Sequence, residues 1–313
     1  MSKKTIKHIL KAAAFITVFC ILFLGLQQIL VPKYRSDGTL NTSDFFQLEE
    51  NSIDVLLLGS SQIVCGVDTP RLKQYYGISA FNFCTSGQFP EIEEYYLKEA
   101  LKTQSPRLVI CDVSSVFMPF EKLANKQAMT YFYTTMPFDR YKLESLYNVS
   151  NGDPGTVFMY TFPLFLFSSR WKELSTDDLT FYTKYKFYTV NGFLRRDIKT
   201  PVTLAFVEEA DGEIYELSDR MKDSLNRISE ICDENGMELL FLKIPSDEWT
   251  RNDSRVLNEF MTENGMEFLD LSDKITEMGL DTEHDFFEPT HLNLYGAAKV
   301  SDYLGEIIEE NLN

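Results

Sequence analysis

Ile53-Asp54-Val55-Leu56-Leu57-Leu58-Gly59-Ser60-Ser61 is the stretch from which the fold of this chain is worked out. Its apolar run is nearly continuous, as in a parallel strand buried on both faces, and it stops at a glycine. A glycine lets the chain turn sharply, so a serine just after it can project its hydroxyl into a crevice. The same residues also suit an ordinary strand-to-helix turn in which Ser60 or Ser61 caps the helix. The stretch therefore predicts a buried strand and offers Ser61 as a candidate nucleophile.

Further short apolar runs alternate with helical patterns along the chain. Strands are expected at residues 80–83, 108–113, 238–244 and 267–270, and helices at residues 68–77, 90–104, 218–235, 253–264 and 294–310. Strands that alternate with helices indicate a parallel sheet with right-handed crossovers. We therefore expect a flavodoxin-like, three-layer α/β/α fold with a five-stranded parallel sheet, in a domain that covers residues 51–313.

The alternation is interrupted between about Val116 and Val207 by a stretch rich in phenylalanine and tyrosine. Phe162–Phe167 is strongly apolar, but Pro163 and the short length argue against a second membrane span. We expect residues 116–207 to be an insertion after the third strand that covers one end of the sheet. It is interpreted as a lid, as a surface against the bilayer or a membrane partner, or as a helical subdomain with an aromatic core.

The N-terminus differs in charge from the rest of the chain. The whole chain of 313 residues has a net charge of −17, but residues 1–32 contain four lysines and no acid. The 20 residues from Ala12 to Val31 carry no charge and as a helix would reach about 30 Å, the thickness of a hydrocarbon core. Lysines ahead of such a segment predict a cytoplasmic N-terminus. We expect a cell-membrane protein with a single-pass signal anchor (residues 1–32), a polar linker (residues 33–50) and an extracytoplasmic domain.

Two other interpretations of the N-terminal segment were weighed. A cleaved signal peptide would need a small-x-small site after the apolar run, and none is present at Leu26–Val31. A buried helix of a soluble protein is the second alternative.

The net negative charge argues against a nucleic-acid partner, which requires a basic surface.

Histidines are scarce, because His8 lies in the N-terminal segment and only His284 and His291 remain. Glu288-Pro289-Thr290-His291 places a carboxylate three residues ahead of an imidazole. On a loop, this spacing lets the acid bind one ring nitrogen while the other ring nitrogen faces a nucleophile. The carboxyl ends of parallel strands meet at one edge of a sheet, where ligands bind. Gly87, which follows the second expected strand, offers a backbone N–H that with that of Ser61 would form an oxyanion hole.

The order of these motifs resembles the SGNH/GDSL hydrolase superfamily over roughly residues 53–120 and 218–312. In that family the first block presents the nucleophile as Gly-Asp-Ser or a variant, which Gly59-Ser60-Ser61 matches with Ser61 as the nucleophile. The oxyanion glycine of the second block falls on Gly87. The last block, Asp-x-x-His followed by Leu-Asn-x-x-Gly, falls on residues 288–296. The resemblance implies a catalytic set of Ser61, His291 and Glu288.

Two positions depart from the family pattern. The last acid is glutamate, one methylene longer than aspartate, and Asp285 is the alternative acid. The third block has an oxyanion asparagine in the family, where this chain has Asp112-Val113-Ser114-Ser115. Either that side-chain donor is missing, or a serine of this block or a residue of the insertion replaces it.

The anchor, the Gly-Ser-Ser variant and the insertion resemble a membrane-anchored branch of the superfamily, with D-alanyl-lipoteichoic acid biosynthesis and alginate acetylation proteins. The resemblance implies a serine esterase or O-acyltransferase that acts on acylated cell-surface polymers or glycans. It implies that the reaction needs no cofactor and that a membrane-bound O-acyltransferase is a partner. The alternative is a non-catalytic scaffold or binding protein that assists such an acyltransferase.

Two other groups of residues were considered as sites. Arg170 and Trp171 form a basic-aromatic pair that suits an anionic or glycan substrate, or else a salt-bridged helix start. The five cysteines have no metal-ligand spacing, so no structural metal is expected, and a disulfide is not expected either. A nucleotide site is not favoured, because no glycine-rich phosphate loop follows the first strand.

Overall fold

The sheet predicted from the apolar runs is present. The computed structural model describes residues 2–35, 38–204 and 216–312. Five parallel strands follow the order β2-β1-β3-β4-β5, which is the flavodoxin-like order. They are β1 (Val55–Leu58), β2 (Ala80–Asn82), β3 (Leu108–Asp112), β4 (Glu238–Lys243) and β5 (Glu267–Asp270). The candidate nucleophile therefore follows a strand that is paired on both sides.

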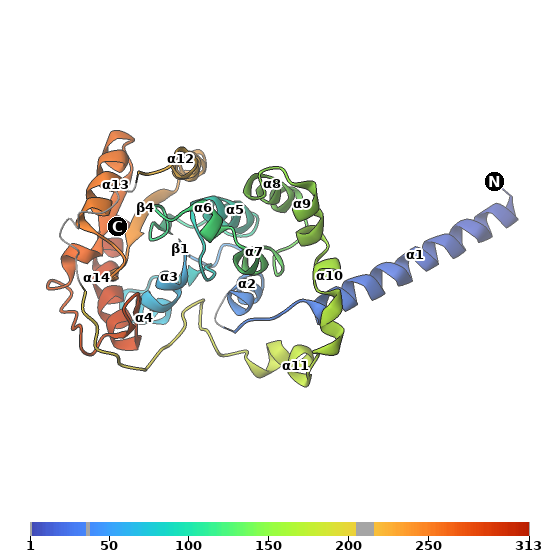
Figure 1. Cartoon of the computed structure of the whole chain (residues 1–313), viewed down its shortest axis with the longest axis horizontal. Helices are drawn as coiled ribbons and strands as arrows, with labels where there is room; N and C mark the ends of the chain where they lie inside the picture. The colour runs from blue at the N-terminus through green and yellow to red at the C-terminus, as the bar shows by residue number, and fades with distance from the viewer. Residues whose placement is uncertain (1, 36–37, 205–215, 313) are drawn as a thin grey trace.

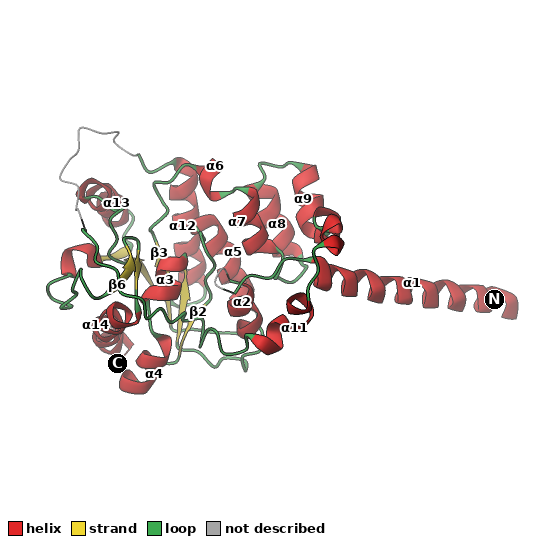
Figure 2. Cartoon of the chain, turned by 60° about the horizontal axis from the view of Figure 1, so that its bottom comes forward, coloured by secondary structure: helices red, strands yellow, loops and turns green. Residues whose placement is uncertain are grey.

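Helices cover both faces of the sheet, which explains why its strands read as continuous apolar runs (Figures 1 and 2). Leu56 and Leu58 belong to one hydrophobic core, and their neighbours Val55 and Leu57 belong to the other. The first core includes side chains of α5 (Pro90–Ala100), α12 (Asp219–Glu234) and α13 (Arg251–Glu263). The second includes side chains of α3 (Ser61–Gly66), α4 (Thr69–Tyr76) and α14 (Leu294–Leu312).

The insertion is a set of short helices. They are α6 (Phe120–Leu123), α7 (Lys126–Tyr133), α8 (Arg140–Val149), α9 (Pro154–Thr161), α10 (Pro163–Leu166), the 3₁₀ helix η1 (Ser168–Lys172) and α11 (Thr176–Lys184). Aromatic side chains such as Phe132 and Tyr133 are fully buried in the first core, as in a helical subdomain. Phe158 and Phe165 are exposed instead. The expected end of the insertion at Val207 lies outside the described residues.

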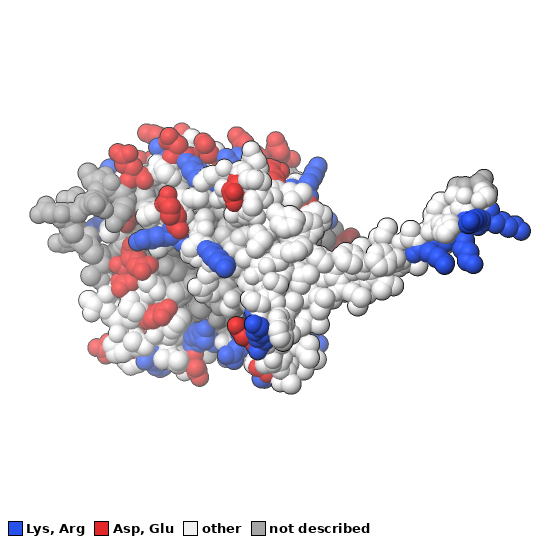
Figure 3. All heavy atoms as spheres, turned by 45° about the vertical axis from the view of Figure 1, so that its right-hand side comes forward, with Lys and Arg blue, Asp and Glu red and all other residues white. Residues whose placement is uncertain are grey.

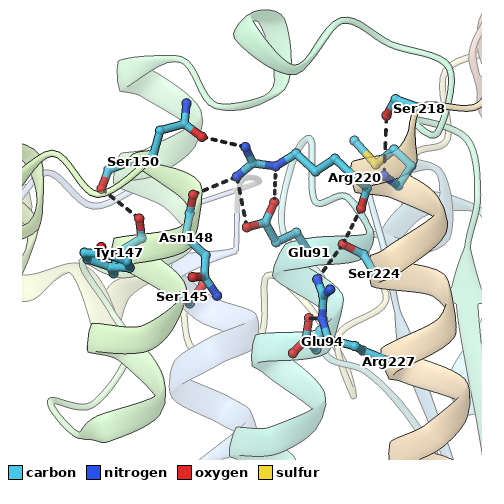
Figure 4. Close-up of polar contacts among 12 residues, drawn as sticks. Glu91, Glu94, Ser145, Tyr147, Asn148, Ser150, Ser218, Arg220, Ser224 and Arg227 are labelled. Atoms are coloured by element: carbon cyan, nitrogen blue, oxygen red, sulfur yellow. Dashed lines mark hydrogen bonds and ion pairs between the residues drawn. The ribbon is translucent and has the colours of Figure 1, made fainter.

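Two arginines of α12 bind carboxylates of α5, and one of them also reaches the insertion (Figure 4). Arg220 binds both carboxylate oxygens of Glu91 on α5, at 2.7 and 3.0 Å, and donates to the carbonyl of Asn148 on α8. Arg227 lies two turns further along α12 and binds Glu94 on α5 at 2.8 Å. Both carboxylates are nearly buried. Glu91 depends on Arg220 for the hydrogen bonds that water would otherwise make, whereas Glu94 also binds Lys98 at 2.7 Å.

Residues 39–45, which were expected within a polar linker, instead form α2 (Thr39–Phe45) and pack on the domain. The ring of Phe45 stacks on Phe83 with centroids 3.8 Å apart. Asn41 Nδ2 donates to the carbonyl of Gly192 at 3.0 Å. The composition of this segment is polar, yet its polar groups are buried because they bind backbone groups of neighbouring segments. The interpretation of residues 33–50 as a plain linker was therefore wrong for this part.

The N-terminal helix α1 (Lys3–Leu30) extends away from the rest of the chain (Figures 1 and 2). It is long and apolar enough to cross a membrane, and no residue of its most apolar window is buried. It contacts the insertion at α10, η1 and α11. Exposure of such an apolar helix argues against a buried helix of a soluble protein.

Candidate active site

Residues 59–61, which we call the nucleophile loop after the candidate nucleophile Ser61, adopt a conformation that requires glycine at position 59. Gly59 follows β1 with a φ of 147°, and an added Cβ would overlap the side chain of Asp112. Ser60 is the N-cap of α3 and its hydroxyl accepts from the N–H of Gln62 at 3.2 Å. Ser61 is the first residue of α3, so its own N–H is not used by the helix. The sharp turn therefore puts the Ser61 hydroxyl at the carboxyl edge of the sheet.

A small hairpin, which sequence reasoning did not predict, carries the histidine and its carboxylate. Its strands β6 (Phe286–Glu288) and β7 (His291–Leu292) are antiparallel, and Glu288 and His291 are direct partners. Glu288 Oε1 lies 2.5 Å from His291 Nδ1. His291 Nε2 lies 2.7 Å from Ser61 Oγ. The Glu-x-x-His spacing thus corresponds to a tight turn that aligns a carboxylate, an imidazole and a hydroxyl.

Burial sets the protonation of the histidine. The His291 side chain is only 16% exposed, whereas that of Glu288 is 48% exposed. Burial lowers the pKa of His291 below its usual value, and the Glu288 carboxylate opposes this shift. Phe287 contributes to the burial, because its ring stacks on the imidazole with centroids 5.3 Å apart. A neutral imidazole near neutral pH can accept the proton of a serine hydroxyl.

Asp285 does not face the histidine. Its carboxylate is buried, where it accepts from Lys299 Nζ at 2.6 Å and from the backbone N–H of Asp281 at 2.7 Å. Thr290 Oγ1 lies 2.8 Å from His291 Nδ1 and is the second group on that ring nitrogen. Of the two acids considered from the sequence, the geometry brings Glu288 to the ring and leaves Asp285 in a structural ion pair.

The loop after β2 lies against the nucleophile loop. The carbonyl of Gly59 accepts from the N–H of Thr85 at 3.3 Å, and the N–H of Gly59 donates to Gln88 Oε1 at 2.6 Å. Gly87, between these two contacts, has a φ of 70° and open space where a side chain would start. The two loops that were expected to supply oxyanion donors are therefore adjacent.

Asp112, the first residue of the stretch in which the family resemblance predicts an asparagine, binds the nucleophile loop. Its Oδ2 accepts from the N–H of Ser60 at 3.1 Å and from the Ser60 hydroxyl at 2.5 Å. Its Oδ1 accepts from the N–H of Ser114 at 2.9 Å and from the Ser114 hydroxyl. Ser114, which was considered as a replacement donor, also contacts Gln62 Oε1 at 2.8 Å. Through these hydrogen bonds, the side chains of Asp112 and Ser114 fix the conformation of the nucleophile loop.

A buried lysine completes this network. Lys243 lies at the end of β4 and is 1% exposed. Its ammonium donates to Gln62 Oε1 at 2.8 Å and to Ser246 Oγ at 3.0 Å. Burial lowers the pKa of Lys243 to about 8. Gln62, the residue after the candidate nucleophile, is thus fixed from β3 and from β4.

The basic-aromatic pair lies beside the end of α1. Arg170 donates to the carbonyl of Leu30 at 2.8 Å and forms an ion pair with Asp178. Trp171 is 65% exposed. A cavity of 610 Å³ near Arg170 is lined neither by Ser61 nor by His291. Arg170 thus forms the ion pair expected of a salt-bridged helix start, and its role in substrate binding stays a prediction.

The described residues form neither a metal-binding cluster nor a disulfide. Within residues 2–35, 38–204 and 216–312, no group of three or more histidine, cysteine, aspartate or glutamate side chains is placed to hold a metal ion. All five cysteines are free thiols. Burial raises the pKa of Cys65 to about 12, so this thiol stays protonated at neutral pH.

Comparisons with known proteins give distant similarities only. No family model matches the chain, and no curated protein matches it. A solved structure provisionally described as an acylhydrolase from Bacteroides fragilis is 10% identical, with a TM-score of 0.43, and covers 87% of this chain and 95% of its own. A provisionally described lipolytic protein of the G-D-S-L family from Desulfitobacterium hafniense is 11% identical, with a TM-score of 0.40, and covers 81% and 98% respectively. Similarities this distant support no inference about the activity of this chain.

Proposed function

We propose that this chain is a membrane-anchored serine esterase or O-acyltransferase that acts on acyl esters of cell-envelope glycans or polymers. The observation that carries the proposal is the alignment of Ser61, His291 and Glu288. The contact between Ser61 Oγ and His291 Nε2 is 2.7 Å long and joins side chains 230 residues apart, and the contact between His291 Nδ1 and Glu288 is 2.5 Å long. Such a series is the arrangement that activates a serine hydroxyl for acyl transfer.

The reaction follows from these contacts. Ser61 Oγ attacks the carbonyl carbon of the acyl ester as its proton passes to His291 Nε2. Glu288 holds the proton on Nδ1 and stabilises the imidazolium that forms. The tetrahedral intermediate collapses, and the leaving alcohol takes the proton from Nε2, which leaves an acyl group on Ser61. Water or a glycan hydroxyl then attacks this ester by the same steps in reverse order.

The oxyanion of the intermediate is proposed to bind the backbone N–H groups of Ser61 and Gly87. Support comes from the hydrogen bonds that join the loops after β1 and β2. One oxyanion donor typically contributes about 3 kcal/mol to lowering the barrier. The side chains after β3 add no amide donor, because Asp112 is an acceptor.

The substrate class rests on the location of the chain. With α1 as a single-pass anchor and lysines at its cytoplasmic end, the site would lie outside the cell membrane. The acyl acceptor or donor is then a polymer or glycan of the envelope, and the acyl group arrives from a membrane-bound O-acyltransferase. Neither a cofactor nor a nucleic acid takes part in this scheme.

The test is a Ser61→Ala variant of the full chain in detergent. We expect labelling by a serine-reactive phosphonate, and turnover of a chromogenic acyl ester, to disappear in Ser61→Ala. Ser105→Ala is the matched control, because Ser105 is exposed and precedes β3, at the opposite edge of the sheet from Ser61. Unchanged labelling and turnover in Ser61→Ala would refute the proposal.

A second candidate function is a non-catalytic scaffold that presents envelope acceptors to a membrane acyltransferase. The lack of an asparagine among residues 112–115 favours it, since the family resemblance predicts a side-chain oxyanion donor in this stretch. Envelope acylation in cells separates the two candidates. If cells with Ser61→Ala kept normal acylation while cells without the protein lost it, the scaffold would be the better description.

A further inference from the structure

One stretch of the insertion has an apolar surface that the proposed reaction does not use. Residues 154–169, between Asp153 and Arg170, contain no charged side chain. They form α9 and α10, which we call the α9–α10 elbow, and the start of η1. Phe158 and Phe165 of the elbow are 47% and 50% exposed. Exposed aromatic groups without charged neighbours mark an interaction surface rather than an ordinary solvent-facing helix.

The elbow packs against α1 about two turns before the end of the helix. Phe23 of α1 contacts the rings of Phe162 and Phe165, with centroids 6.2 and 6.3 Å apart. Phe158 contacts the same two elbow rings, each at 5.3 Å. Figure 1 shows α10 beside the base of α1, and Figure 3 shows a nearly uncharged surface continuous with that helix. The aromatic cluster therefore forms one apolar surface together with α1.

The length of α1 fixes the depth of this cluster. Phe23 precedes Leu30 by seven residues, which is about 10 Å along a helix. If the bilayer ended at Phe23, the uncharged segment from Ala12 would span only about 18 Å. The hydrocarbon core is about 30 Å thick, and a shorter span would draw Lys11 into it. A transmembrane α1 thus requires that the contact between Phe23 and the elbow lies below the membrane surface.

We propose that the α9–α10 elbow is immersed in the outer leaflet of the lipid bilayer, beside α1 and without crossing. This inference rests on the anchoring role proposed for α1, but not on the hydrolytic or transferase activity. The depth of about 10 Å matches that of apolar faces that lie in the interface. Pro163 and the four-residue length of α10 prevent a second span.

Polar groups at the end of α1 are arranged as expected for the headgroup level. Arg170 binds the last helical carbonyl, that of Leu30, and Lys33 Nζ donates to the carbonyl of Gln28 at 2.7 Å. Trp171, which is largely exposed, follows Arg170 directly. Basic and tryptophan side chains prefer this layer of a membrane, while phenylalanine prefers the acyl chains. A protein partner would not require this sequence of layers, so the lipid bilayer is the occupant that the surface favours.

Fluorescence quenching by lipids brominated in the middle of the acyl chain tests the depth. The full chain is reconstituted in phosphatidylcholine–phosphatidylglycerol vesicles with Trp171→Phe as the background, and buried Trp249 is kept. Phe165→Trp adds one reporter in the elbow. Tyr75→Trp is the matched control, because Tyr75 is 60% exposed on α4, at the opposite end of the molecule from α1 (Figure 1). We expect brominated lipids to remove most of the emission added by Phe165→Trp and little of that added by Tyr75→Trp.

Equal quenching of the two reporters in vesicle-bound protein would overturn the proposal and favour a protein partner for the elbow. A chain that does not float with the vesicles would overturn both the immersion and the anchor. Phosphonate labelling of Ser61 in the same samples reports on the proposed chemistry separately. Loss of labelling with normal quenching would therefore leave the immersion standing.

Discussion

Replacement of Glu288 by glutamine tests how the candidate site orients its histidine. The carboxylate lies 2.5 Å from His291 Nδ1, and the opposite ring nitrogen lies 2.7 Å from Ser61 Oγ. Glutamine keeps the length of the side chain but removes its charge. The variant therefore loses the charge-assisted hydrogen bond that stabilises the imidazolium formed during acyl transfer.

The size of the expected rate loss follows from the exposure of the Glu288–His291 pair. A hydrogen bond to a charged group contributes about 1.5–3 kcal/mol, or about 10- to 150-fold in rate. Glu288 is 48% exposed, so solvent screens its charge, and Thr290 Oγ1 remains as a neutral acceptor 2.8 Å from Nδ1. We therefore expect kcat/KM for an acyl ester to fall about 10- to 30-fold in Glu288→Gln.

The pH dependence of kcat/KM gives an independent readout of the same variant. Burial lowers the pKa of His291, and the Glu288 carboxylate raises it. Removal of that carboxylate lowers this pKa further, so the acid limb of the profile should move to lower pH. A change that merely damaged the fold would reduce the rate without this shift.

Asp285→Asn is the control, because Asp285 was the other acid considered from the sequence. Its carboxylate binds Lys299 and does not contact the imidazole. We expect this variant to lose stability but to keep the rate and the pH profile of the folded protein. The assignment of Glu288 would be refuted if Glu288→Gln were fully active with an unshifted profile while Asp285→Asn lost activity.

Three further predictions concern stability and the nucleophile loop. Arg220→Met should lower the free energy of unfolding in urea by about 3 kcal/mol, because it leaves the buried Glu91 carboxylate unpaired. The control Arg255→Met removes one partner of an exposed ion pair and should change this free energy by less than about 0.5 kcal/mol. Equal effects of the two variants would contradict the prediction. Burial raises the pKa of Glu93. The contribution of Glu93 to stability is therefore largest at a pH below its unfolded-state pKa and declines as the pH rises through its higher folded-state pKa. Glu93→Gln should be more stable than the wild type at neutral pH, and its melting temperature should depend less on pH. Gly59→Ala should abolish phosphonate labelling and lower the melting temperature, because the added methyl group would overlap the Asp112 side chain and the positive φ of residue 59 disfavours alanine. Labelling at the wild-type level would show that the loop tolerates the methyl group.

The sheet was predictable because its signals are local. Each strand is a short apolar run, and its boundaries differ from the expected ones by two residues or fewer. The helix starts carry similar local signals, such as Asp68, which caps α4 through the N–H of Arg71. The hairpin of β6 and β7 gave no such signal, because strands of three and two residues show no periodicity. Its presence follows from the pairing of Glu288 with His291.

The polar network beneath the nucleophile could not be predicted, because its members are distant in sequence. Asp112 is 52 residues from Ser60, and Lys243 is 181 residues from Gln62. The sequence placed these side chains after β3 and at the end of β4, but it did not show that they converge on one loop. Burial of the lysine, and with it the lowered pKa, depends on this convergence.

Asp112 also bears on the rate that the site would reach. An asparagine among residues 112–115 would offer an N–H to the oxyanion, whereas the carboxylate of Asp112 accepts hydrogen bonds from Ser60 and Ser114. One donor fewer raises the barrier by about 3 kcal/mol, which slows each acyl transfer about 10²-fold. The same oxyanion forms whether water or a glycan hydroxyl attacks the acyl-enzyme. The loss therefore applies equally to hydrolysis and to transfer.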